Sequence, residues 1–378
     1  MSRRLVASTI SVVLVALLAL GCSSPAPAPT PTKAPAAPTK AAEPAKAAEP
    51  TKPAATTPAA TKPTEPTPAP TAVPKTTEFP TKGRSITFIV PWGAGGPNDV
   101  GTRILSPILE KGLGVPVQVV NKAGAGGQVG MTEVALAKPD GYTLGAAALE
   151  STISAYLDEE RKAAFDRKSL VPLALHVIDP AVIAVKADSP YRTVKDLVDA
   201  AKAKPNTIKA AIAGILGDDH QGFLKFQKAA GTQMSMVQFD SAAVAVTSLL
   251  GGHVDVDFGN VSEFPAHVKA GSIRVLAIMD PQENKFLPGV PTLESQGIRV
   301  YNASSRGVAV AAGTPKDVVD ILARAIQQAM QSEEHVKKMD ELFLTPRYMN
   351  PEQFATYWDQ VEAEMKPVIA EFRASEKK

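Results

Sequence analysis

Two short glycine-rich segments are the parts of this chain whose residue types and spacing best suit ligand chemistry. Residues 93–96 read Gly-Ala-Gly-Gly, and residues 124–127 repeat the same four residues. Glycine lets the backbone approach a ligand closely, and the unpaired N–H groups at a helix start favour an anion. One such loop is most often a tight turn between a strand and a helix. Two in succession favour an anion-binding site.

Motifs for other chemistry are missing from the sequence. The second glycine segment lacks the third glycine of GxGxxG, and GxxxxGK does not occur. HExxH and GxSxG are also absent, and the five histidines show no metal-ligand spacing with one another. We therefore expect a protein that is not an enzyme and that uses no cofactor and no metal. A secreted hydrolase is the weakest of the alternatives.

Each glycine segment follows a predicted strand and leads into a predicted helix. Residues 85–90 form a short apolar run rich in β-branched side chains, and residues 115–121 form a second. Capping-box patterns predict helix starts at Thr193 and Thr314. Further strands are predicted at residues 142–146, 208–213, 235–239, 254–258 and 275–279. This alternation predicts an α/β protein with a largely parallel sheet in each domain and a ligand beyond the carboxyl ends of the strands.

The N-terminal part differs from the rest in composition and charge. Residues 23–80 hold 16 of the 33 prolines and no Leu, Ile or Met. Such a segment cannot bury enough apolar surface to order its backbone, so we predict a disordered tether over residues 23–82. Arg3, Arg4 and a lysine excess in the tether account for the net charge of +2, because residues 81–378 hold 32 basic and 34 acidic side chains. That balance argues against a nucleic-acid partner.

The first 22 residues have the pattern of an export signal. Two arginines precede an almost continuously apolar run at residues 5–20, which is too short to span a bilayer. The run leads to Cys22, the only cysteine, and the small residues before it resemble the lipobox of bacterial lipoproteins. We predict a lipoprotein signal peptide over residues 1–22, a lipid on Cys22, and a protein anchored to the outer face of the cell membrane or periplasmic. An ordinary signal or an uncleaved anchor helix is the alternative.

Three longer motifs carry a family resemblance. They read Ile-Val-Pro-Trp-Gly-Ala-Gly-Gly-Pro-Asn-Asp at 89–99, Asn-Lys-Ala-Gly-Ala-Gly-Gly at 121–127 and Lys-Pro-Asp-Gly-Tyr-Thr-Leu at 138–144. Together with later segments they make residues 84–365 similar to the substrate-binding proteins of tripartite tricarboxylate transporters, also called the Bug family.

The resemblance implies a two-lobed fold of the periplasmic-binding-protein type II class, with a mostly parallel sheet in each lobe and the ligand in the cleft between them. Residues 83–186 and 303–378 would form lobe 1, and residues 187–302 lobe 2. The family also implies a monomer that captures a small organic carboxylate and delivers it to a large and a small membrane subunit. A ligand-binding input module for a membrane sensor is the alternative.

The resemblance further implies where the ligand binds. In the family the two glycine loops clasp a carboxylate of the ligand. From the first lobe, the predicted ligand-binding residues are Trp92, Gly95, Gly96, Asn98, Asp99, Gly126, Gly127, Gln128 and Ser151. From the second lobe and the return crossing, they are Asp219, His220, Asp240, Asn260 and Arg306.

Two of these predicted residues need comment. A carboxylate repels an anion, so Asp99 is expected to hold its loop rather than touch the ligand. Many relatives have a lysine where this chain has Asp240. The exchange removes a positive charge from the cleft and leaves room for a ligand with an amino group.

Overall fold

The computed structural model describes residues 78–377. Cys22, the predicted signal and nearly all of the predicted tether lie outside the described residues. In the described part, no helix has the length and the apolar character that crossing a membrane requires.

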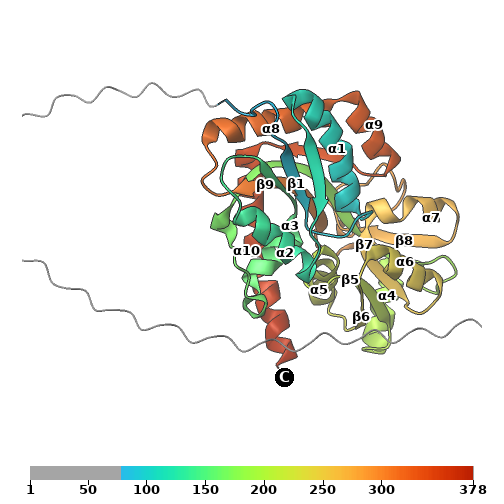
Figure 1. Ribbon diagram of the computed structural model, residues 1–378. Coiled ribbons are helices and arrows are strands. Elements are labelled where there is room, and N and C mark those ends of the chain that lie inside the picture. Colours follow the sequence, from blue (N-terminus) through green and yellow to red (C-terminus); the bar gives the residue numbers. More distant parts are fainter. Residues whose placement is uncertain (1–77, 378) are drawn as a thin grey trace, which may run out of the picture. The chain divides into compact units, whose positions relative to one another are not determined.

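The first half of the sheet holds the strands that lead into the glycine loops. Its three parallel strands are β2 (Val117–Asn121), β1 (Ile86–Val90) and β3 (Thr143–Ala148). Side chains of β1 alternate between two cores, because Phe88 and Val90 face one and Ile89 faces the other. The helices on one side are α1 (Pro97–Leu113) and α8 (Lys316–Gln331), with α9 (Glu333–Glu341) beside them (Figure 1). Those on the other are α2 (Gln128–Ala135), α3 (Leu149–Leu157) and α10 (Pro351–Glu376).

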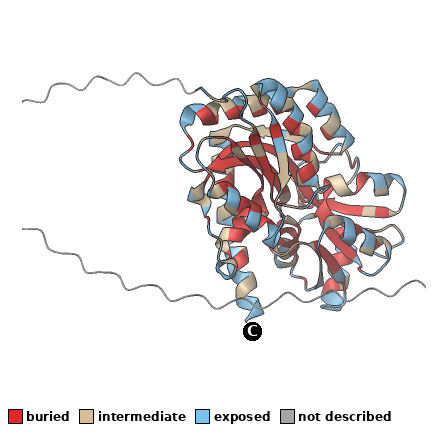
Figure 2. Cartoon of the chain, viewed as in Figure 1, coloured by how far each residue is buried: buried red, intermediate tan, exposed pale blue. Residues whose placement is uncertain are grey.

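The second half repeats this plan. Its parallel strands are β7 (Val256–Asn260), β5 (Lys209–Ala213) and β6 (Ser235–Phe239). Its helices are α4 (Val194–Ala203) and α5 (Asp218–Ala230) on one face, and α6 (Ala242–Leu250) and α7 (Pro265–Lys269) on the other. Figure 2 shows buried residues concentrated along the strands of both halves.

One long strand joins the two halves. β4 (Leu170–Lys186) pairs antiparallel with β9 (Ala303–Ala311) as far as Pro180. From Ala181 onward it pairs antiparallel with β7 and with β8 (Ile273–Ile278). β10 (Pro346–Met349) also pairs antiparallel with β4. The described strands therefore form a single sheet whose main path is β2-β1-β3-β9-β4-β7-β5-β6.

The prediction of a two-lobed α/β fold is confirmed, with one difference in the sheet. Each lobe has the predicted parallel β-α units, but β4, β8, β9 and β10 pair antiparallel, so the sheet is mixed. The crossings predicted near residues 182–188 and 302–308 lie beside the point where β4 changes partners. The exact lobe boundaries stay a prediction.

One of the two predicted capping boxes is confirmed. Thr193 caps α4, because its side chain accepts a hydrogen bond from the Asp196 backbone while the Asp196 side chain accepts one from the Thr193 backbone. The box at Thr314 is wrong. The Thr314 hydroxyl donates to the carbonyl oxygen of Ala311 at 2.8 Å, and α8 begins only at Lys316.

The terminal helix α10 contacts both halves of the molecule. Phe354, Trp358 and Met365 are buried in the core that α10 shares with α2 and α3. Further along, the ring of Phe372 lies 4.8 Å from the ring of His220 on α5. α10 therefore supports the element of the second half that begins at the candidate site.

Candidate functional site

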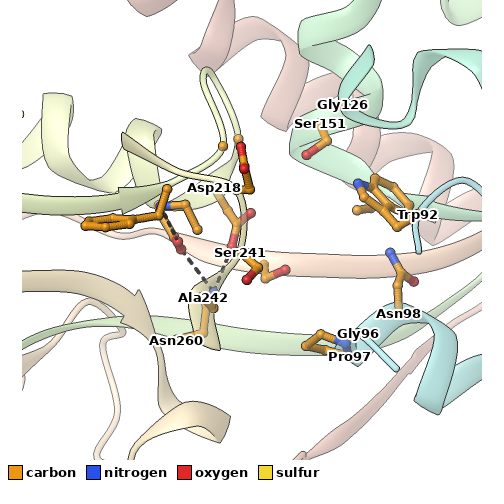
Figure 3. Close-up of a pocket in the computed structure, with 18 of the residues that line it drawn as sticks. Trp92, Gly96, Pro97, Asn98, Gly126, Ser151, Asp218, Ser241, Ala242 and Asn260 are labelled. Atoms are coloured by element: carbon orange, nitrogen blue, oxygen red, sulfur yellow. Dashed lines mark hydrogen bonds between the residues drawn. The ribbon is translucent and has the colours of Figure 1, made fainter. Parts of the chain in front are cut away.

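A cleft of about 650 Å³ lies at the carboxyl ends of the parallel strands of both halves. Loops after β1, β5 and β6 line it, together with the end of β7 and the start of β9. Predicted residues that line the cleft are Trp92, Gly96, Asn98, Gly126, Ser151, Asp219, Asp240, Asn260 and Arg306. Figure 3 shows Trp92 and Asn98 on one side of it and Asp218 and Asn260 on the other. The structure thus brings together residues far apart in the sequence.

Behind the first glycine loop, Asp99 and Asn121 fix its backbone. Asp99 is 2 % exposed and accepts hydrogen bonds from the Gly95 N–H at 2.9 Å and from the Asn121 amide at 2.9 Å. The same amide donates to the carbonyl oxygen of Trp92. Burial alone would raise the pKa of Asp99, but hydrogen bonds from Arg103 and Gly95 hold it below its usual value. Asp99 therefore holds the loop, and neither it nor Gly95 is part of the cleft lining.

The second glycine loop presents only Gly126 to the cleft. Gly127 has a φ of +90°, and a Cβ there would lie 2.7 Å from the Trp92 ring, so its lack of a side chain lets that ring pack on the loop. The Gly127 N–H donates within the loop to Gly124. Gln128 points behind the wall, where its amide donates to the carbonyl oxygen of Arg161. Of the four glycine N–H groups expected to bind an anion, those of Gly95 and Gly127 are thus used inside their own loops.

The opposite wall carries several acidic side chains. The Asn260 amide nitrogen donates to Asp218 at 2.8 Å and to Asp219 at 3.2 Å. Asn260 is 4 % exposed, and its carbonyl oxygen Oδ1 accepts no hydrogen bond from any residue that the structure describes. Asp219 also accepts from the Ala213 N–H, which ties α5 to the end of β5. We call Asp218, Asp219, Asp240, Asn260 and Glu263 the acceptor wall.

His220 does not reach the cleft. Its ring is fully buried, and Nδ1 accepts a hydrogen bond from the Leu216 N–H at 2.9 Å. Burial lowers the pKa of His220 to about 4, so the ring is neutral at pH 7. The residue fixes the loop that precedes α5 and supplies no donor to the cleft lining.

Arg306 sits on β9 where the two halves meet. Its Nη2 donates to Asp179 at 3.2 Å, and both side chains are buried, at 7 % and 1 % exposed. Ser262 also donates to Asp179, from its backbone N–H and its hydroxyl. The second guanidinium nitrogen, Nη1, donates to no described residue, although Arg306 lines the cleft. Arg306 therefore holds a buried cationic donor without a described partner at the edge of the cleft.

Several residues around the cleft were not predicted. Arg161 lines it, donates from Nη2 to the carbonyl oxygen of Ile215, and leaves Nη1 without a described partner. No motif marks this arginine, which ends a short 3-10 helix, Glu159–Arg161. Asp179 did leave a signal in the sequence, because it interrupts the apolar run that forms β4. The other residues missed are Asp218, Glu263, Glu150 and Asp257.

The buried acids near the acceptor wall repel one another. Burial, followed by the charges of Asp218 and Glu263, raises the pKa of Asp219 well above its usual value. Burial and the charge of Asp257 do the same to Glu263. Burial and the charge of Asp218 raise the pKa of Glu150 to about 7. Extra negative charge is therefore unfavourable on this side of the cleft.

The buried carboxyl group of Asp257 should make the free energy of unfolding depend on pH. It is 1 % exposed, its Oδ2 has no described partner, and burial raises its pKa to about 7. The folded protein therefore holds this proton more tightly than the unfolded chain, and stability falls as pH rises from about 4 to about 7. We expect Asp257→Asn to raise the free energy of unfolding by about 2–4 kcal/mol at pH 8, with a much smaller effect at pH 4.

Urea unfolding at both pH values checks this expectation. The exposed Asp199→Asn variant is the control and should change stability by less than about 0.5 kcal/mol at either pH. An equal effect of Asp257→Asn at the two pH values would contradict the assignment.

Comparisons with known proteins identify the family to which this sequence is similar. A family model described as the tripartite tricarboxylate transporter family receptor matches residues 102–373. Protein BugT of Bordetella pertussis is 30% identical over 272 residues, which cover 71% of this chain and 83% of BugT.

Two solved structures have a similar fold. A TctC solute binding protein from Polaromonas, solved without ligand, is 29% identical, with 77% of this chain and 99% of that chain covered and a TM-score of 0.67. MatC from Rhodopseudomonas palustris with bound malate is 23% identical, with 76% and 100% covered and a TM-score of 0.66. At that identity, MatC shows the fold alone.

Proposed function

The chain belongs to the tripartite tricarboxylate transporter receptor family, and from that premise we propose that it captures a small organic carboxylate outside the cytoplasm and delivers it to the large and small membrane subunits of such a transporter. Proteins of this family are periplasmic solute-binding receptors. The family model covers most of the part of the chain that forms the two lobes.

The unpaired Nη1 of Arg306 is the observation that carries the proposal. A buried guanidinium hydrogen-bonds most favourably to a carboxylate, because the bond is charge-assisted. Gly96 and Asn98, which line the cleft at the start of α1, add the positive end of a helix dipole on the same lobe as Trp92. MatC, which has a similar fold, was solved with bound malate, a small organic carboxylate.

Binding of a panel of ligands to the purified full-length chain tests the proposal. The panel pairs acetate, succinate, glutarate, adipate, glycine, aspartate and glutamate with their amides, each measured by calorimetry and by the melting temperature. We expect at least one carboxylate or amino-bearing carboxylate to bind and to raise the melting temperature, while its amide does not. Binding of amides alone, or of no carboxylate with or without an amino group, would overturn the proposal.

Attachment to the membrane through Cys22 is part of the same proposal, although Cys22 lies outside the described residues. We expect Cys22→Ala to move the protein from the membrane fraction to the soluble fraction, because a lipid chain would be lost. Cell fractionation followed by immunoblotting measures this, and continued membrane association of the variant would contradict a lipid anchor. We further propose that the protein acts as a monomer.

A further inference from the structure

The charges that line the cleft are not distributed evenly. Four acids, Asp218, Asp219, Asp240 and Glu263, come from the second lobe at the ends of β5, β6 and β7. The two basic residues of the lining, Arg161 and Arg306, come from the loop after α3 and from β9. The acidic side chains of the cleft therefore lie on the second lobe, beside Ser241 and the N-terminal ends of α5 and α6, and neither arginine comes from that part of the lining.

The orientation of Asn260 strengthens this polarity. Its amide nitrogen donates to two carboxylates, Asp218 and Asp219. Turning the amide around would place its carbonyl oxygen against the Asp218 carboxylate, which disfavours that orientation. As a result, Oδ1 is a buried acceptor without a donor among the described residues, and a buried unpaired acceptor is costly.

Glu263 belongs to the same wall, and its carboxyl group packs against the backbone of β7. Its Oε2 has no described hydrogen-bond partner and lies so close to Gly259 that a Cβ on residue 259 would be 2.4 Å from it. A ligand carboxylate beside Asp218 would meet a like charge, whereas a positively charged nitrogen there would meet the oxygens of Asp218 and Asn260. A metal ion is a poorer occupant, because no group of three His, Cys, Asp or Glu side chains among residues 78–377 is arranged to hold one.

We propose that the cleft selects a carboxylate that also carries a positively charged amino group, with the ammonium against Asp218 and Asn260 and the carboxylate toward Arg306. The ligand class is that of amino acids and other amino-carboxylates. This inference rests on the proposed function, since it presupposes that a carboxylate binds. It adds that the ligand also carries a positive charge.

The exposed carboxylate of Asp240 also favours a ligand with a positively charged group. It lies on the loop between β6 and α6 and lines the cleft beside Ser241. A carboxylate at that position attracts a cationic ligand into the cleft. Asp240 thus extends the acceptor wall toward solvent.

Pairs of ligands that differ only by an amino group test the inference directly. The pairs are glycine and acetate, aspartate and succinate, glutamate and glutarate, and 6-aminohexanoate and hexanoate, titrated by calorimetry into the full-length chain. We expect the amino-bearing member of at least one pair to bind at least tenfold tighter than its partner. Tighter or equal binding of the partner in every binding pair overturns the inference and leaves the proposed function intact. Binding of no member of any pair also overturns the inference, and it overturns the proposed function as well if adipate fails to bind.

Variants of the acceptor wall separate selectivity from folding. Asp218→Asn keeps an oxygen that can accept from Asn260, so it preserves the fold while it removes the charge. We expect it to lower the affinity for the amino-bearing ligand about tenfold and to leave the affinity for the partner without the amino group unchanged or higher. Asp240→Asn, on the exposed loop, should change the two affinities in the same direction. Asp199→Asn, which is also exposed, should change the affinity for neither ligand. A loss of both ligands in Asp218→Asn and no change in Asp240→Asn would overturn the assignment of the ammonium to this wall.

Discussion

Replacement of Arg306 with methionine is expected to lower the free energy of unfolding by about 3–5 kcal/mol at pH 8. The substitution destabilises the fold because it leaves the buried carboxylate of Asp179 without its counter-ion. Asp179 is 1 % exposed on its side chain, and without Arg306 its carboxylate keeps only the hydrogen bonds from Ser262. A buried charge without its counter-ion is among the most destabilising changes a fold can suffer. Urea unfolding of the purified variant measures the loss.

A second substitution distinguishes the ion pair from simple loss of packing. Asp179→Asn combined with Arg306→Met removes both charges, so the double variant should recover more than half of the lost stability. The exposed Arg299→Met, which removes an arginine paired with Glu294, is the matched control and should cost less than about 1 kcal/mol. Carboxylate binding should be lost in the single and the double variant alike, because both lack Nη1. A double variant no more stable than the single would contradict the role of the pair.

The second large effect is expected at Gly130 in the first turn of α2. A Cβ there would lie 2.7 Å from the Cα of Pro91 and 2.9 Å from the carbonyl oxygen of Lys122, and both are backbone atoms. Alanine can therefore fit only if α2 moves away from the loop after β1. Such overpacking costs about 2–3 kcal/mol. Because Gly126 lies just before α2, we also expect ligand affinity to fall at least tenfold.

Gly112 offers the matched control for Gly130→Ala. It also lies in a helix, α1, but no atom lies within 4 Å of the position that a Cβ would take, so alanine fits without movement. Gly112→Ala should stabilise the protein by about 0.5–1 kcal/mol through helix propensity and leave affinity unchanged. Thermal unfolding and calorimetry on both variants check the pair. Equal effects of the two substitutions would show that backbone contact at Gly130 is not the cause.

Local patterns predicted much of the fold because they depend on neighbours in the sequence. The apolar run that forms β1 and the reciprocal capping at Thr193 are of this kind, and both appear in the structure. β4 was missed because Pro172 and Pro180 break the pattern of a central strand. The structure accommodates them by a register shift after Pro172 and by the change of pairing partner after Pro180.

The site was predictable only where a residue type reveals its own geometry. The glycine loops were found because glycine permits close backbone approach, and both loops contribute to the cleft. The ion pair of Arg306 with Asp179 joins residues 127 positions apart, and no local pattern specifies that pairing. The unpaired Oδ1 of Asn260 became evident only from the full set of hydrogen bonds around it.

Because β4 runs through both halves, it constrains how the cleft between them can open. A cleft between lobes on flexible linkers could open by a free swing, but here the shared strand must bend. Hydrogen bonds link Ala181, Asn302 and Met279 beside Pro180, at 2.7–3.0 Å, and they limit the amplitude of that bend. Asp179 directly precedes the bending point and holds Arg306. Arg306, which lines the cleft, is therefore tied to the segment of β4 that any opening of the cleft must bend.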